Sequence, residues 1–187
     1  MNSALLLIAA VLLGCGTGQH PATAQHSGDE ELDFVVSILG REYEAYFASD
    51  STLLIHGVFL SGAHMLLEAP DSLSQDLVQD YVAKSAARQD VWPELATRLP
   101  IVILTPAALD SIFSNVGIHN QGLEAQLRLR YPRSRPELSL LTRVGFNRDR
   151  DLALWYAGSS NQGALCVYRK ADLLWVIDGV VFAHTHL

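Results

Sequence analysis

The residues of this chain that are best suited to chemistry stand near its C-terminal end, in the tripeptide His184-Thr185-His186. In a β-strand the side chains of residues i and i+2 point to the same side, so both imidazoles can reach one ion. Zinc needs three or four protein ligands, which the fold would have to complete. We therefore retain His184 and His186 as candidate metal ligands without favouring a metal site, and the candidates for a further ligand are His56, His64, Glu68 and Asp178.

Two polar segments begin like known motifs and then depart from them. Asn147, Asp149 and Asp151 alternate like the start of a calcium loop, but Leu152 stands where that loop needs glycine. We therefore expect a polar turn. The serines between Gly158 and Gly163 lie between two expected strands, whereas a nucleophile elbow joins a strand to a helix. The sequence contains no phosphate loop or dinucleotide fingerprint, so we expect no cofactor and favour a non-catalytic protein.

The first residues read as a targeting signal. Ala4–Leu13 is an unbroken apolar run, too short for a bilayer span of about 20 residues but suited to a secretory signal. The run ends in Leu12-Leu13-Gly14-Cys15, which resembles the lipobox of bacterial lipoproteins: an aliphatic residue, a variable one, a small one and cysteine. The resemblance implies that Cys15 receives a diacylglyceryl group. Residues 1–14 would then be the signal peptide, and the membrane would be a partner.

Other forms of processing stay open. Ala22-Thr23-Ala24 satisfies the small-x-small rule, and cleavage there would release a soluble secreted protein that begins at Gln25. An uncleaved anchor is the third possibility. Gly16, and not aspartate, follows Cys15, so the lipoprotein interpretation points to the outer membrane, facing the periplasm or the exterior. Residues 15–29 are mainly small and polar, and we interpret them as a flexible tether.

The bulk composition limits the class of protein. The chain has 187 residues, of which 49% are hydrophobic, and its net charge is −7. Such apolar content supports a folded body, which we place in one α+β domain at residues 30–187. The acidic balance argues against nucleic acid, whose phosphates need clusters of Lys and Arg. A protein or small-molecule partner is left unidentified.

The predicted elements divide the body into two halves. Apolar residues at helical spacing predict N-terminal helices, with short extended segments near residues 52–60 and 101–104. Thr105-Pro106 predicts the start of one helix, with Thr105 as the N-cap and Pro106 in the first turn. The C-terminal third predicts four strands joined by loops too short for a crossover helix. These strands are Leu138–Phe146, Leu152–Ala157, Ala164–Lys170 and Leu173–Ala183. We therefore expect an α+β fold, with N-terminal helices packed on one face of a C-terminal antiparallel β-meander of about four strands.

A spaced series in this region carries a second resemblance. The series includes Tyr131-Pro132, Arg143-Val144-Gly145-Phe146-Asn147, Lys170 and Trp175. It resembles a group of small, uncharacterised exported bacterial proteins with a Tyr-Pro segment, an Arg-Val-Gly-Phe-Asn strand motif and a closing Lys…Trp hairpin. The chain has Thr142 where that group usually has serine. It also lacks the cysteines that we associate with the loop near Gly163.

Two residues of this series carry their own expectations. Gly145, inside a predicted strand, indicates a bulge or the close approach of another backbone. With Cys15 lipidated, Cys166 has no disulfide partner, and we expect a small buried apolar side chain there. Together, the sequence predicts a cell-envelope lipoprotein that acts as a non-catalytic module for a ligand or partner. The alternative is a metal-dependent or hydrolytic envelope enzyme that uses His184 and His186.

Overall fold

The structure is a computed structural model that describes residues 26–66, 73–114, 120–159 and 161–185. Cys15, the predicted signal peptide and most of the predicted tether lie outside these residues. The helical elements are α2 (His26–Glu42), α3 (Glu44–Phe47), η1 (Ala63–Leu66), α4 (Gln75–Ser85), α5 (Leu95–Arg98), α6 (Pro106–Phe113) and α7 (Asn120–Arg130). The strands are β1 (Thr52–His56), β2 (Ile101–Leu104), β3 (Ser134–Leu141), β4 (Gly145–Phe146), β5 (Leu152–Gly158), β6 (Gln162–Ala171) and β7 (Leu174–Thr185).

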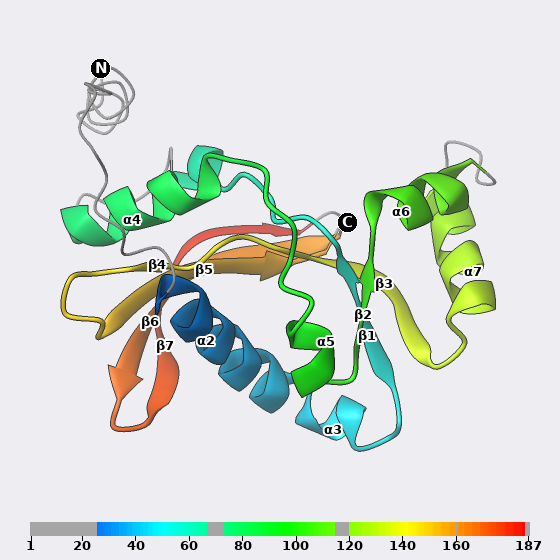
Figure 1. Ribbon diagram of the computed structural model, residues 1–187, viewed down its shortest axis with the longest axis horizontal. Coiled ribbons are helices and arrows are strands. Elements are labelled where there is room, and N and C mark those ends of the chain that lie inside the picture. The colour runs from blue at the N-terminus through cyan, green and yellow to red at the C-terminus, as the bar shows by residue number, and fades with distance from the viewer. Residues whose placement is uncertain (1–25, 67–72, 115–119, 160, 186–187) are drawn as a thin grey trace.

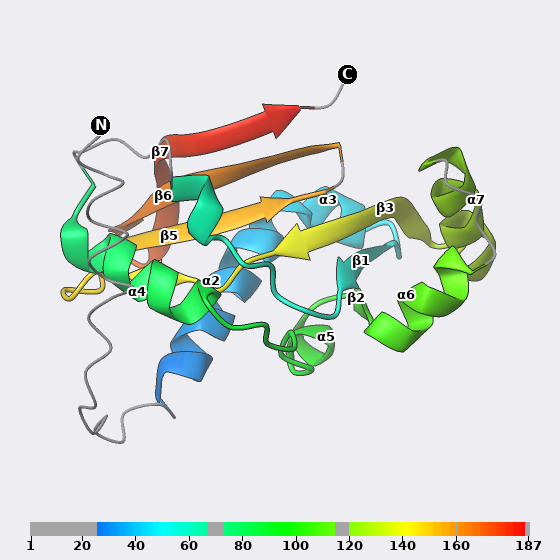
Figure 2. The same cartoon turned by 90° about the horizontal axis from the view of Figure 1, so that it is seen from above.

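The described strands form one mixed sheet of seven strands, in the order β2-β1-β3-β5-β6-β7, with β4 also paired to β5 (Figure 2). Strand β1 runs parallel to β2 and to β3. Strand β5 runs antiparallel to β3, β4 and β6, and β6 runs antiparallel to β7. The predicted fold class, N-terminal helices on a four-stranded antiparallel meander, is therefore wrong.

The error has two physical causes. Strands β1 and β2 are only five and four residues long, and their apolar runs do not reveal their partner. The intervening residues 57–100 are numerous enough for the crossover that parallel strands require. In addition, the predicted strand Leu138–Phe146 is divided into β3 and β4. At the break, the Thr142 hydroxyl accepts a hydrogen bond from the Tyr156 N–H at 3.2 Å, and the Leu60 N–H donates to the Leu141 carbonyl at 2.8 Å.

Helices cover both faces of the sheet, so the expectation that they cover one face is also wrong. Figure 1 shows α4 above the sheet and α2 below it. Neighbouring residues of β5 point to opposite faces. Trp155 therefore packs against Phe34 of α2, with ring centroids 5.7 Å apart, whereas Leu154 belongs to the cluster that contains Leu77 and Tyr81 of α4.

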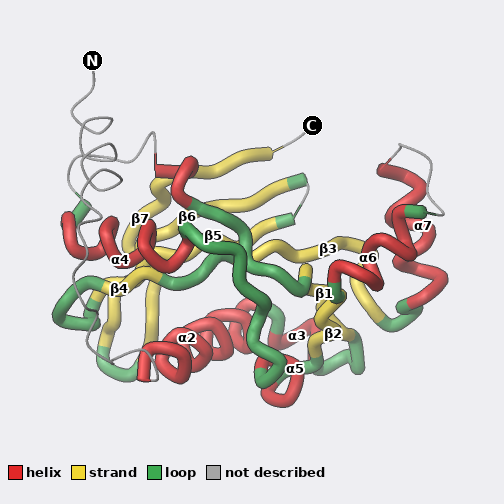
Figure 3. Tube along the Cα trace, turned by 45° about the horizontal axis from the view of Figure 1, so that its top comes forward, coloured by secondary structure: helices red, strands yellow, loops and turns green. Residues whose placement is uncertain are grey.

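A third buried cluster fills the end of the sheet next to β1 and β2, where α6 and α7 lie (Figure 3). Helix α6 begins as its sequence predicts. The Thr105 hydroxyl accepts a hydrogen bond from the Ala108 N–H at 3.3 Å, and Pro106 occupies the first turn, where its missing N–H costs nothing.

Strand β7 carries two extra residues relative to its neighbour β6. Tyr168 pairs with Ile177 and Val167 with Gly179, which leaves Asp178 as one extra residue. Cys166 pairs with Val180 and Leu165 with Phe182, which leaves Val181 as the other. Such bulges bend a strand and increase its twist. The end of the β6–β7 hairpin accordingly turns toward the face that carries α2 (Figure 1).

Candidate functional site

Only one histidine of the predicted pair lies within the described residues. His184 lies in β7, and its ring stacks on that of Tyr156 with centroids 6.2 Å apart, whereas His186 lies outside. Glu68 is likewise outside the described residues. Within them, no group of three or more His, Cys, Asp or Glu side chains is placed to hold a metal ion. The metal hypothesis for the pair stays a prediction.

Two of the other proposed ligands are engaged elsewhere. The Nδ1 atom of His56 lies 3.1 Å from the backbone N of Val58 and accepts its hydrogen. The Asp178 carboxylate is held by Arg169, with Oδ2 2.8 Å from Nη2. Hydrogen bonding to this guanidinium lowers the pKa of Asp178 below its ordinary value.

The Asn147–Asp151 segment is a polar turn, as expected. The Asn147 side-chain oxygen accepts hydrogen bonds from the N–H groups of Asp151 and Leu152, at 3.1 and 2.9 Å. Its amide nitrogen donates to Asp151 Oδ1 at 2.6 Å. One side chain thus closes the loop between β4 and β5. These oxygens satisfy the turn and do not converge on a cation.

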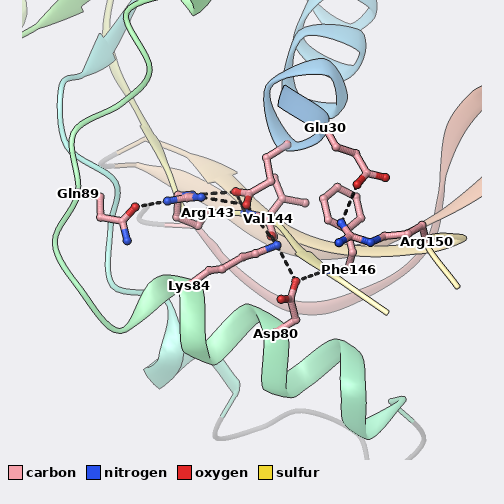
Figure 4. A network of polar contacts seen from close by, with 9 residues as sticks. Glu30, Asp80, Lys84, Gln89, Arg143, Val144, Phe146 and Arg150 are labelled. Carbon is pink, nitrogen blue, oxygen red and sulfur yellow. Dashed lines mark hydrogen bonds and ion pairs between the residues drawn. The ribbon is translucent and has the colours of Figure 1, made fainter. Parts of the chain in front are cut away.

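The Arg-Val-Gly-Phe-Asn segment surrounds a buried carboxylate between α2 and α4 (Figure 4). Glu31 of α2 is fully buried. Arg143 holds it with two hydrogen bonds, from Nε to Oε2 at 2.7 Å and from Nη2 to Oε1 at 2.9 Å. The Lys84 Nζ atom lies 3.2 Å from Oε1, and the Val144 N–H donates to Oε2 at 3.3 Å. Four donor atoms therefore compensate the carboxylate for its lost hydration.

The same segment contacts α4 directly. Asp80 Oδ2 accepts hydrogen bonds from Lys84 Nζ and from the Phe146 N–H, both at 2.7 Å. A Cβ atom at Gly145 would lie 2.6 Å from the N and Cα atoms of Tyr81. The expected close approach at Gly145 is confirmed, because only glycine fits this near to the backbone of α4. The segment thus holds two helices to the sheet.

A pocket of about 360 Å³ lies at the other end of α2, against the face of the sheet formed by β3, β5 and β6. Its volume falls in the lower part of the range typical of small-molecule sites, ~300–1,000 Å³. Strand β3 contributes alternate residues, which share one face: Arg135, Glu137, Ser139 and Leu141. Helix α2 and the residue after it contribute Leu39, Glu42 and Tyr43.

The pocket is hollow because three adjoining strands carry short side chains there. Ala157 of β5 pairs with Ala164 of β6, which pairs with Ala183 of β7. The methyl groups of these three residues leave space that longer side chains would fill. All three line the pocket and give it an apolar floor.

The rim of the pocket is charged. Burial raises the pKa of Glu42 above its ordinary value, a shift that the nearby Arg41 opposes. Glu42 is nevertheless exposed to solvent, and its side chain forms no hydrogen bond or ion pair with any other described residue. Burial also raises the pKa of Tyr43, and the charges of Arg135, Glu42 and Glu137 interact electrostatically with its hydroxyl. Arg135 and Glu137 form an ion pair of 3.3 Å.

Nearby groups with nucleophilic atoms are not activated. The Ser159 hydroxyl closes the β5–β6 turn and accepts a hydrogen bond from the Asn161 N–H at 3.2 Å. Cys166 is buried below the sheet surface, as expected, and burial together with the charge of Glu42 raises its pKa. A raised pKa keeps the thiol protonated and unreactive at neutral pH.

The sequence marks one part of this pocket and not another. His184 and four residues of the Gly158–Gly163 segment, both considered as candidate sites, line the pocket. Glu42, Arg135 and Glu137 are not marked, and the last two precede the strand that the sequence predicts. One signal is present in the sequence: Arg135, Glu137 and Ser139 alternate in the period of a strand. This alternation marks a polar face, but it does not show that α2 covers that face.

Comparisons of the chain with protein-family models, with curated proteins and with solved structures gave no match. The resemblance to exported bacterial proteins and to the lipobox therefore stays a prediction. Among the described residues, no helix is both long enough and apolar enough to cross a membrane.

Proposed function

We propose that this chain is a non-catalytic binding module of the bacterial cell envelope, held at the outer membrane by a lipid on Cys15. Its ligand is a small amphipathic molecule with a protonated amino group. The observation that supports this most is the position of the Glu42 carboxylate, which lines a pocket with an apolar floor and forms no hydrogen bond or ion pair with another described residue.

The charges of the pocket favour a cation. Glu42 and Glu137 are acidic, whereas Arg135 is already paired with Glu137, and His184 also lines the pocket. An ammonium group beside Glu42 would give this carboxylate a charged hydrogen-bond donor, which the described residues do not supply. The ring of Tyr43 adds an aromatic face of the kind that attracts cations.

The floor of the pocket selects the rest of the ligand. Leu39, Leu141 and the three alanines offer apolar surface, so an alkyl or aryl group fits beneath the ammonium group. Each buried methylene contributes about 0.8 kcal/mol. Selectivity for the amine over an uncharged analogue is therefore the property that identifies this site.

The binding experiment compares hexylammonium with hexanol, which share the alkyl chain, by NMR titration of the full mature protein. We expect shifts at Ala157 and Ala164 with both probes, and tighter binding of the amine. Glu42→Gln should weaken the binding of the amine by about tenfold and leave the binding of hexanol unchanged. Glu44→Gln, which removes an exposed carboxylate outside the pocket, is the matched control. Equal binding of both probes to the unaltered chain would refute the proposed ligand class.

The anchor is tested separately by mass spectrometry of the mature N-terminus. A diacylglyceryl group on Cys15 is the expected result. A chain that begins at Gln25 would remove the anchor from the proposal and leave the pocket intact.

A further inference from the structure

We infer that the tip of the β6–β7 hairpin, residues 171–177, rests in the surface layer of the bilayer to which the protein is anchored. This inference depends on the proposed lipid at Cys15, because the anchor keeps the hairpin near the membrane. It assigns a lipid-contacting surface that is distinct from the pocket.

The hairpin exposes an unusual set of aliphatic side chains. Their exposed fractions are 92% for Leu173, 60% for Leu174, 40% for Val176, 55% for Ile177 and 60% for Val180. Exposed apolar groups gathered in one place mark a contact with a protein or a membrane.

The arrangement of these side chains favours lipid over protein. Val176 and Ile177 are neighbours in a strand and therefore point to opposite faces of the hairpin. Leu173 lies at the turn and is the most exposed of the five. Exposed aliphatic side chains therefore lie at the end of the tip and on both sides, while Trp175, on the side of Ile177, is buried against Phe34. A protein partner covers one face of such a hairpin, whereas a bilayer can contact the exposed side chains at the end and on both sides.

The length of the N-terminal connection allows this contact. Residues 16–25 join Cys15 to His26, and a fully extended chain of this length spans about 35–40 Å. Phe34 lies about 12 Å further along α2. Its ring packs against Trp175 of the hairpin, with centroids 5.2 Å apart. A lipid on Cys15 therefore keeps the tip within reach of the bilayer surface.

The charges near the tip balance. Arg169 pairs with Asp178 at 2.8 Å, Lys170 lies over the ring of Trp175 at 5.7 Å, and Asp172 occupies the turn. The net charge of the chain, −7, disfavours anionic lipids. Contact therefore depends on apolar burial in a zwitterionic bilayer, and the charged groups keep it shallow.

The experiment places a fluorescent reporter at the tip of the lipidated protein. In a Cys166→Ala background, Leu174→Cys is labelled with nitrobenzoxadiazole and the protein is reconstituted in phosphatidylcholine vesicles. Leu129→Cys is the matched control, because Leu129 is 75% exposed in α7, at the opposite end of the molecule (Figure 1). We expect the emission at 174 to shift to shorter wavelength and to be quenched by spin-labelled lipid. The emission at 129 should show neither effect.

A further variant and the remaining outcomes separate the hairpin contact from self-association and from failure of the anchor. Adding Leu173→Asp to the labelled chain should reduce both effects at 174, while circular dichroism stays unchanged because this side chain is exposed. Identical emission at 174 and 129 in vesicles would overturn the inference. A concentration-dependent shift at 174 without vesicles, and without lipid quenching, would assign the tip to a second copy of the chain. If mass spectrometry shows no lipid on Cys15, the anchor fails, whereas an unquenched tip in a lipidated protein refutes the hairpin contact alone.

Discussion

The glutamates near the two ends of helix α2 have opposite environments. Near its first turn, Glu31 is fully buried and receives hydrogen bonds or ion pairs from Arg143, Lys84 and the Val144 N–H. At its last residue, Glu42 is exposed to solvent and has no such donor among the described residues. The protein therefore occupies the oxygen atoms of the first carboxylate and leaves those of the second open.

This difference separates a structural site from a binding site. A carboxylate whose oxygen atoms are already occupied joins elements of the fold and has no capacity for a ligand. A carboxylate without a protein partner beside an open pocket still has that capacity. The region that the sequence marks most clearly, Arg143–Asn147, is therefore the structural one. The charged residues of the proposed ligand site, Glu42, Arg135 and Glu137, are not marked by the sequence, although His184 in the same pocket is.

The largest effect is expected from removing the compensated carboxylate. Glu31→Ala leaves Arg143 and Lys84 largely buried without their shared partner, which should reduce the free energy of unfolding by about 3–5 kcal/mol. Urea denaturation followed by circular dichroism measures this loss. Arg169 holds Asp178 with the same two-bond geometry at the surface. Asp178→Ala should therefore change stability little, and equal effects of the two variants would show that burial is not decisive.

An intermediate effect is expected from enlarging Gly145, because a side chain there pushes α4 away from the contacts around Glu31. Gly145→Ala places a methyl group against the backbone of Tyr81 and should cost about 1–3 kcal/mol by overpacking. Gly179→Ala is the control, because a Cβ atom there meets nothing within 4 Å. Amine binding at the other end of α2 should survive in the folded Gly145→Ala chain. Loss of binding there would mean that the two ends of the helix are coupled.

The smallest effect concerns the uncompensated carboxylate and depends on pH. The raised pKa of Glu42 means that the folded state binds its proton more tightly than the unfolded state does. Its contribution to stability is thus full below the ordinary glutamate pKa and is lost as pH rises through the raised value. Glu42→Gln should therefore melt at a slightly higher temperature than the natural chain at neutral pH, and the difference should disappear in acid.

Calorimetry at a series of pH values measures this difference, and Glu44→Gln corrects for the loss of one negative charge. A stabilisation by Glu42→Gln that does not change with pH would contradict the conclusion that folding raises the pKa of Glu42.

The parts of the fold that the sequence predicts correctly are governed by local rules. The Thr105-Pro106 helix start and the Asn147 turn each depend on hydrogen bonds within a few residues. The close approach at Gly145 is also predictable, because a glycine inside a strand marks a bulge or a neighbouring backbone. In each case the residue type itself carries the physical constraint.

The parts that sequence reasoning misses depend on distant partners. Nothing local in Thr52–His56 shows that it lies between β2 and β3 and parallel to both. In the sequence, Arg135 and Glu137 resemble residues of an exposed loop, because nothing near them shows that the end of α2 lies over them. The pocket also depends on Ala157, Ala164 and Ala183 meeting across three strands, which is a matter of register and cannot be read from one strand.

The two extra residues in β7, Asp178 and Val181, have a consequence for how this molecule can change over evolution. Each inserted residue shifts the inside-outside alternation of the strand by one position. Two such shifts restore the alternation beyond Asp178, where Trp175 belongs to the buried core. Loss of only one extra residue would turn Trp175 to the opposite face, so the core is kept only if the two residues are lost together.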